Sequence, residues 1–237
     1  MGGYNNIGIS NELDVGRISH LYRLGIFAAL MVLAGDLILG WGVTDDSLSG
    51  IDQYFSRYLT VSDGRILASS LLGLIGIPVE CLCYFGIYRV IANRSEKLAH
   101  IYRSGILGML AFGSFVHVVC CAVIYHLNAI HRIDPSASSD EAVRFALYFL
   151  MPVSVIFFVF FFLTVITQII AFAKGHTPYP KWCWIFSIAS GIVIVLITRL
   201  FGNSPFANAL GTGWISLGSI WTYAGLLISM RHIDCRQ

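Results

Sequence analysis

Six long runs of apolar residues dominate this chain, and each is long enough to cross the hydrocarbon core of a membrane. About 20 residues of α-helix span the roughly 30 Å of that core. Backbone groups in lipid must be hydrogen-bonded within their own segment, so the runs are predicted to be helices. The sequence therefore predicts an all-α, polytopic membrane protein, with residues 1–237 forming one bundle of six transmembrane helices. The runs lie at approximately 21–43, 66–92, 102–130, 145–173, 182–201 and 206–230.

The composition supports lipid as the main solvent of the chain. Hydrophobic residues make up 57% of the 237 residues and charged residues 12%, about half the charged share of an ordinary soluble domain. The formal net charge of +2 is too small to indicate a nucleic-acid partner. The partner that the composition does indicate is the lipid bilayer.

The distribution of Lys and Arg predicts the orientation. With six crossings, the loops after the second and fourth runs lie on the same side as both termini, and these loops are basic. Their basic residues are Arg94, Lys97, Arg103, Lys174 and Lys181. The loops at 44–65 and 131–141 on the other side carry more acidic residues. Because cytoplasmic loops are enriched in Lys and Arg, both termini are predicted to be cytoplasmic, in a multi-pass protein of the cell membrane.

The clearest ionisable residues deep inside the apolar runs are Asp36, Glu80 and His117. A charged side chain at the centre of a bilayer costs about 2.5–3.5 kcal/mol on insertion scales. Intramembrane ionisable residues are therefore candidate functional residues. We predict a buried polar site in which Asp36 or Glu80 acts as an acid or base and His117 is its partner.

Small and polar residues repeat at helical spacing on three of the predicted helices and are expected to face the bundle interior. They are Ser69, Gly73, Gly76, Glu80 and Tyr84 in the second helix, Ser114, His117, Cys121, Tyr125 and Asn128 in the third, and Asn208, Thr212, Ser216, Ser219 and Tyr223 in the sixth. The candidate contacts to a ligand are Ser69, Ser114, Tyr125, Arg199, Asn208 and Thr212. The alternative is that such residues only pack and cross-link membrane helices.

Depth along the helices suggests which of these groups meet. Glu80 and His117 have similar predicted depths, so a contact between them is the leading expectation. Arg199, near the outer end of the fifth run, either reaches to the interface or forms an ion pair with Asp36. His117 with Asp36 or Glu80 offers at most a weak metal site, because no HxxxH or HExxH spacing occurs. We assign no metal ligands, and the cofactor is unknown.

The segments LAGDLILGWG (33–42) and RILASSLLGLIGIPVECLCYFGIYRVI (65–91) resemble a group of uncharacterised bacterial membrane proteins with six helices. The shared features are a Gly-Asp pair in the first helix, a Ser- and Gly-rich second helix and a histidine in the third. Gly35, Asp36 and His117 match them here. The resemblance implies a location in the bacterial inner membrane, and it implies no function. A more distant similarity is to intramembrane zinc hydrolases, which have seven helices and several spaced histidines that this chain lacks.

Three functions remain open from the sequence. The first is an enzyme or binding protein for a lipid or other small amphiphile, favoured by a titratable cluster in an aromatic-rich bundle. The second is a small-molecule or proton-coupled transporter, in which the same groups form a relay. This version favours a homo-oligomer, because one six-helix chain is small for a carrier. The third is a non-catalytic membrane scaffold.

Overall fold

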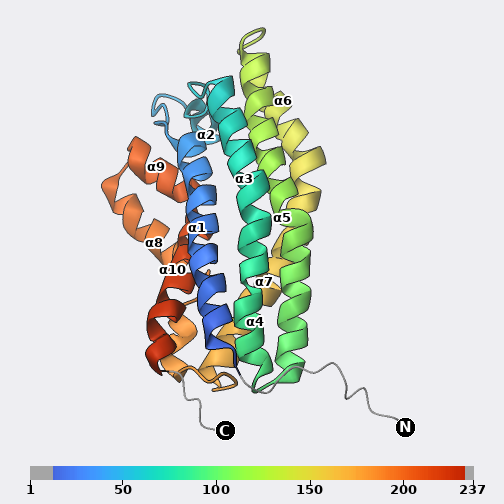
Figure 1. Ribbon diagram of the computed structural model, residues 1–237. Helices are drawn as coiled ribbons and strands as arrows, with labels where there is room; N and C mark the ends of the chain where they lie inside the picture. The colour runs from blue at the N-terminus through green and yellow to red at the C-terminus, as the bar shows by residue number, and fades with distance from the viewer. Residues whose placement is uncertain (1–12, 233–237) are drawn as a thin grey trace, which may run out of the picture.

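The structure is a computed structural model, and it describes residues 13–232. Every regular element in this range is helical, so the all-α prediction is confirmed. The helices are α1 (Val15–Gly40), α2 (Gly50–Ser56), α3 (Asp63–Cys83), α4 (Phe85–Ala92), α5 (Glu96–His131), α6 (Ser138–Phe145), α7 (Met151–Ala173), α8 (Ser190–Thr198), α9 (Pro205–Thr212) and α10 (Trp214–Ser229) (Figure 1). Short turns of other helical types cover Ala146–Leu150, Lys181–Ile185, Arg199–Phe201 and Met230–His232.

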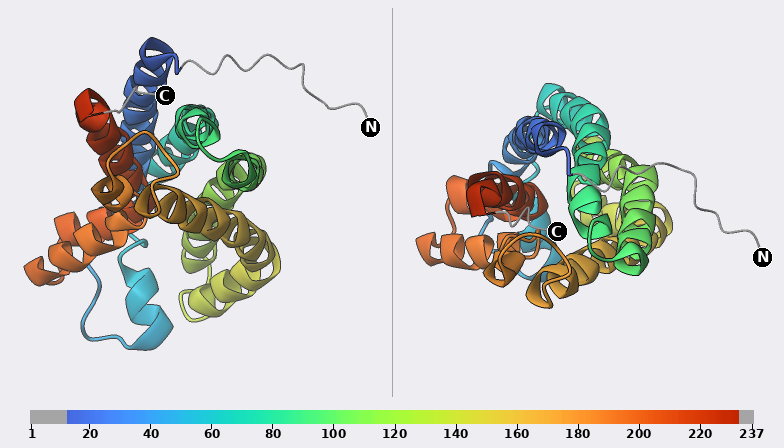
Figure 2. Two further views of the ribbon diagram at one scale, coloured as in Figure 1. Left: turned by 90° about the horizontal axis from the view of Figure 1, so that it is seen from below. Right: turned by 60° about the horizontal axis from the view of Figure 1, so that its bottom comes forward.

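Four helical segments are long and apolar enough to cross a membrane. They are Val15–Gly40, Asp63–Ala92, Glu96–His131 and Ser138–Ala173, and they contain most of the first four predicted spans. α1, α3, α5 and α7 pack side by side in chain order, and α10 packs on the free side of α1. Figure 2 shows these helices from the end of the bundle at which α1 begins. The membrane character predicted from the sequence therefore agrees with the structure.

The last two predicted spans differ from the expectation, because neither forms one continuous helix. The 182–201 run contains a short turn at Lys181–Ile185 and then the nine-residue α8. The 206–230 run is interrupted at Gly213, between α9 and α10. Thr212 Oγ1 donates a hydrogen bond to the carbonyl of Asn208, four residues earlier. Such bonds bend helices, and mean hydropathy alone does not reveal the interruption.

A π-helical turn at Ala146–Leu150 interrupts the fourth long segment before α7. Pro152 follows it within the first turn of α7. Proline has no backbone N–H, so the helix cannot make its regular hydrogen bond at this point. A π-turn accommodates the irregular register without ending the helix. The predicted 145–173 helix consequently begins earlier, at Ser138.

Two close backbone contacts hold the start of α8 and the turn before it against α10. A Cβ added at Gly218 of α10 would collide with the backbone carbonyl of Ile188. A Cβ added at Gly191 of α8 would collide with the carbonyl of Trp214. Small residues allow membrane helices to approach this closely. The broken C-terminal segment is therefore held firmly to the bundle.

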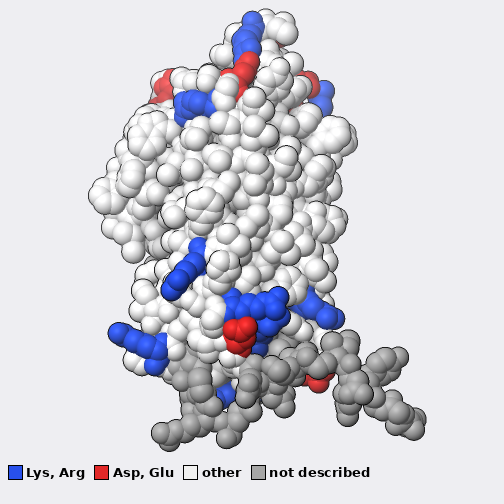
Figure 3. Space-filling view, viewed as in Figure 1, with Lys and Arg blue, Asp and Glu red and all other residues white. Residues whose placement is uncertain are grey.

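Charged side chains gather at the two ends of the molecule. In Figure 3, Lys and Arg predominate at the end where α1 begins and α10 finishes, and the opposite end carries both signs. The band between them is almost free of charge in this view. At the end that carries α2, the guanidinium of Arg65 donates to the carbonyl oxygens of Ile38 and Trp41. It thereby satisfies acceptors that the C-terminus of α1 leaves unpaired.

Two aspartates at the same end stabilise tight turns. Ser47 donates to Asp45 through its backbone amide and its hydroxyl, and Ser136 does the same for Asp134. These hydrogen bonds favour the charged carboxylate, so they lower the pKa of Asp45 and of Asp134. Both turns are therefore best stabilised while the aspartates are ionised.

Candidate functional site

A cavity of about 260 Å³ lies where α1, α3, α5, α7, α9 and α10 meet. All three intramembrane ionisable residues line it, each from a different helix. Its polar lining residues are Asp36, Glu80, His117, Ser154, Thr212 and Ser216. Apolar side chains form most of the remaining wall, among them Leu39, Met109, Phe157 and Phe158. The cavity thus combines a few polar groups with an apolar lining, as small-molecule sites commonly do.

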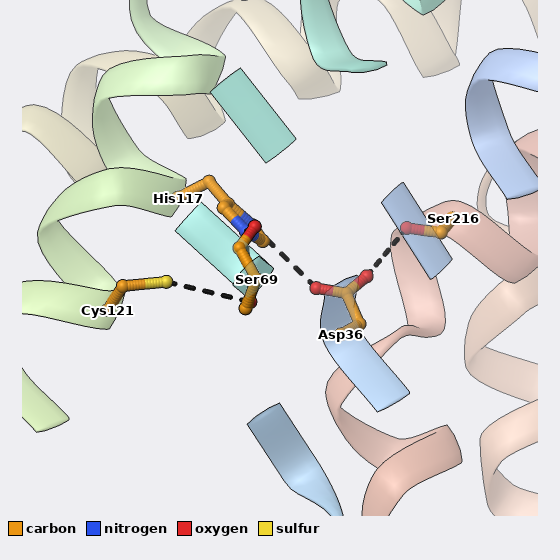
Figure 4. A network of polar contacts seen from close by, with 5 residues as sticks. All are labelled: Asp36, Ser69, His117, Cys121 and Ser216. Carbon is orange, nitrogen blue, oxygen red and sulfur yellow. Dashed lines mark hydrogen bonds and ion pairs between the residues drawn. The ribbon is translucent and has the colours of Figure 1, made fainter. Parts of the chain in front are cut away.

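Asp36 lies in the last turn of α1, where it is 8% exposed. Its Oδ2 accepts a hydrogen bond of 2.7 Å from the hydroxyl of Ser216 in α10. Its Oδ1 lies 3.7 Å from Nδ1 of His117 in α5. Figure 4 shows the carboxylate between these two partners. Because Gly213 has no side chain, α10 can begin directly beside Asp36.

His117 is fixed from the opposite side by the backbone of α3. Its Nε2 lies 3.0 Å from the carbonyl oxygen of Ser69. A carbonyl oxygen only accepts hydrogen bonds, so Nε2 carries a proton. Nδ1 is then the nitrogen that faces Asp36 (Figure 4). If Nδ1 carried only a lone pair and Asp36 were ionised, two hydrogen-bond acceptors would face each other, which is unfavourable. We therefore infer that the Asp36–His117 pair holds one further proton, either on Nδ1 or on the carboxyl group.

Gly73 provides the surface on which the imidazole lies. A Cβ added at Gly73 would overlap the His117 ring at Cδ2, Nε2 and Cγ. The ring therefore lies directly against the backbone of α3. This close approach sets the direction in which Nδ1 points.

Glu80 lies elsewhere in the same cavity, 5% exposed. Its carboxyl group lies near the hydroxyls of Ser219 and Tyr84, which are 2.8 Å from each other. Its backbone carbonyl accepts a 2.7 Å hydrogen bond from Tyr223. Ser216, which donates to Asp36, and Ser219, which lies near Glu80, are three residues apart on α10.

The expected contact between Glu80 and His117 is wrong, because His117 faces Asp36 and Ser69 instead. Ser69 precedes Glu80 by 11 residues on α3, which is about 16 Å along a helix axis. The alternative ion pair between Arg199 and Asp36 is also absent from the described residues. Arg199 is exposed in the turn after α8, and both Asp36 oxygens face other groups.

Only some of the other residues predicted to contact a ligand line the cavity. Thr212 lines the cavity, whereas Ser69 is fully buried behind His117. Asn208 lies outside the cavity and donates hydrogen bonds to the carbonyl of Gly42 and to Asn203. It therefore anchors the α8–α9 turn to the end of α1.

Ser114 and Tyr125 do not line the cavity either. The buried hydroxyl of Ser114 has no hydrogen-bond partner within residues 13–232. Tyr125 is 51% exposed, contrary to the expected inward position. Eight residues of helix turn Tyr125 about 80° away from His117, and this rotation accounts for its exposure.

Sequence reasoning did not select Ser216 or Gly73 as site residues. Both lie on the inward stripes, Ser216 four residues after Thr212 and Gly73 four residues after Ser69. The spacing therefore contained a signal for them. Their roles depend on which neighbouring helix they meet, and spacing within one helix does not give that.

The order Ser69–His117–Asp36 is that of a serine-hydrolase triad, but the geometry does not support one. Ser69 Oγ is 3.4 Å from His117 Nε2, farther than the carbonyl that already takes the Nε2 proton. Ser69 does not line the cavity, so its hydroxyl cannot meet a ligand there. In the part of the chain described, no three His, Cys, Asp or Glu residues are grouped to hold a metal. The arrangement suits binding and proton exchange.

The contact between Gly73 and His117 can be tested by adding one methyl group. Gly73→Ala is expected to destabilise the protein by about 1–3 kcal/mol, the usual cost of overpacking a core, because the imidazole must move. In a His117→Ala background most of that cost should vanish. Unfolding in detergent measures both values.

Gly64→Ala is the matched control, since no neighbouring atom lies within 4 Å of a Cβ added there. It should cause no comparable loss. An equal cost for Gly73→Ala with and without His117 would show that the ring does not lie on Gly73.

A model described as a family of unknown function (DUF6796) matches residues 4–232, which includes every element of the cavity. No curated protein and no solved structure matches the chain. The comparisons therefore supply no substrate, reaction or partner.

Proposed function

The chain belongs to DUF6796, a family of unknown function, in agreement with its resemblance to an uncharacterised family, and we propose that it binds a small amphiphile inside the membrane. The observation that carries this proposal is the cavity among six helices, with Asp36, Glu80 and His117 on an otherwise largely apolar wall. An amphiphile presents both an apolar chain and a polar head to such a wall. Asp36 and His117 would contact the polar head, and Phe157 and Phe158 the apolar part.

The proposal predicts that a bound amphiphile survives gentle purification. Native mass spectrometry of the wild-type protein should show a retained ligand, and Ser154→Phe, which places a ring in the cavity, should lose it. Tyr125→Phe changes a half-exposed aromatic residue outside the cavity and should retain it. A ligand that is equally abundant in all three proteins would be ordinary surface lipid, and the proposal would fail.

A proton-coupled transporter is the second candidate, favoured by the proton held between Asp36 and His117. The helix interruption beside Asp36 adds support, since many transporters place their sites at broken helices. The carrier would then work as a homo-oligomer. In proteoliposomes, a pH gradient should drive uptake of the ligand at least about tenfold faster in wild type than in Asp36→Asn, which cannot share the proton in the same way. Uptake that does not depend on the pH gradient would exclude a proton-coupled transporter.

We also propose six membrane crossings with both termini cytoplasmic, in the bacterial inner membrane, with α8 and α9–α10 as broken fifth and sixth crossings. Asn203, in the turn before α9, bonds to Thr44 beyond the end of α1. This contact supports placing that turn on the side opposite the termini.

Epitope tags at the N-terminus and after Gln237 should be reached by antibody only from the cytoplasmic side. A tag inserted after Ser136 should be reached only from the outside. Any tag found on the wrong side would refute the topology.

A non-catalytic scaffold is the remaining alternative. In that case, substitutions of Asp36, Glu80 and His117 would change only stability. The native mass spectrometry above separates it from a binding protein, because a scaffold retains no ligand in the cavity.

A further inference from the structure

The hydrogen-bond capacity left open in the cavity consists mostly of acceptors. The hydroxyl proton of Thr212 goes to the carbonyl of Asn208, and that of Ser216 goes to Asp36. The Nε2 proton of His117 goes to the carbonyl of Ser69. Among the polar lining groups, only Ser154 keeps a hydroxyl without a hydrogen bond in the described structure. A ligand that fits this wall must therefore supply donors.

The charge of the cavity points the same way. Two carboxyl groups line it, and none of the lining residues that the structure describes is Lys or Arg. The two ring nitrogens of His117 are directed at Asp36 and at the carbonyl of Ser69, so neither is directed at Glu80. Among the described residues Glu80 has hydroxyl neighbours but no basic partner. A positive ligand would supply the basic partner that Glu80 lacks.

The two carboxyls line the same cavity, Asp36 from α1 and Glu80 from α3. An ammonium group has three donors, so it can donate to an oxygen of each. Phe157 and Phe158 lie on the same wall, and aromatic faces attract cations and pack apolar chains.

We infer that the amphiphile is a short-chain primary amine, bound as its ammonium ion between Asp36 and Glu80 with its alkyl chain against α7. This inference rests on the proposed binding function and names the class of ligand. The cavity is smaller than the roughly 300–1,000 Å³ of pockets for drug-sized molecules, so the chain must be short. No bond is made or broken in this step.

The test compares n-hexylamine with n-hexanol, which share a chain and differ in the charged head. Binding to the full-length protein in detergent is followed by isothermal titration calorimetry. Hexylammonium should bind at least about tenfold more tightly than hexanol, as expected for a charge-assisted hydrogen bond. Asp36→Asn and Glu80→Gln should each weaken amine binding about tenfold or more and leave hexanol affinity within about twofold.

Two controls exclude partition into detergent and general charge effects. Ser154→Phe should abolish saturable binding of both probes. Asp140→Asn makes the same chemical change as Asp36→Asn on an exposed residue of α6 and should leave both affinities unchanged.

The outcomes separate the inference from the proposed function. If hexanol binds as tightly as hexylamine, or if both carboxyl variants retain full amine binding, the amine inference fails and the amphiphile proposal stands. If neither probe binds saturably to wild type, both fail. The comparison of the two probes on wild type requires no variant, so a variant that does not fold leaves the test intact.

Discussion

The centre of this bundle depends on one constraint, which is that the hydrogen-bonding groups of Asp36 and His117 must find partners within the protein rather than in water. Each group would be costly alone among apolar side chains, and together they hold one proton between them. Ser216 donates a hydrogen bond to the carboxyl group of Asp36, and the carbonyl of Ser69 accepts one from the imidazole of His117. The four groups come from α1, α3, α5 and α10. A single polar network therefore sets the relative register of helices that are otherwise held by non-directional apolar packing.

The C-terminal segment shows how backbone irregularity serves the same centre. The interruption at Gly213 brings the start of α10 beside Asp36, and the next two turns carry Ser216 and Ser219 to the two carboxyls. A continuous helix over 206–230 would present these hydroxyls at different angles. Irregular backbone is tolerated at membrane depth where protein surrounds it or where it lines a cavity. Here α8, packed backbone to backbone at Gly191 and Gly218, covers the segment.

The sequence predicted the membrane character, the four long helices and the inward position of Asp36 and Glu80, because hydropathy and helical period are local properties. It did not predict the helix interruptions, since a mean hydropathy is unaffected by one bent turn at Thr212. It also paired Glu80 with His117, although Asp36 is the partner of His117. Depth along a helix can be counted in residues, but the rotation of one helix against another depends on packing. The error at Tyr125 has the same origin, since a drift of about 80° over eight residues turned the side chain outward.

The flat contact between Gly73 and the His117 ring has an evolutionary consequence. Two positions 44 residues apart in the chain cannot vary independently, because a side chain at the first occupies the space of the ring at the second. A relative that carries alanine or a larger residue at the position of Gly73 must have moved or lost the imidazole. The identity of this pair would therefore distinguish a relative that has inherited the proton-holding centre from one that has kept only the helical bundle.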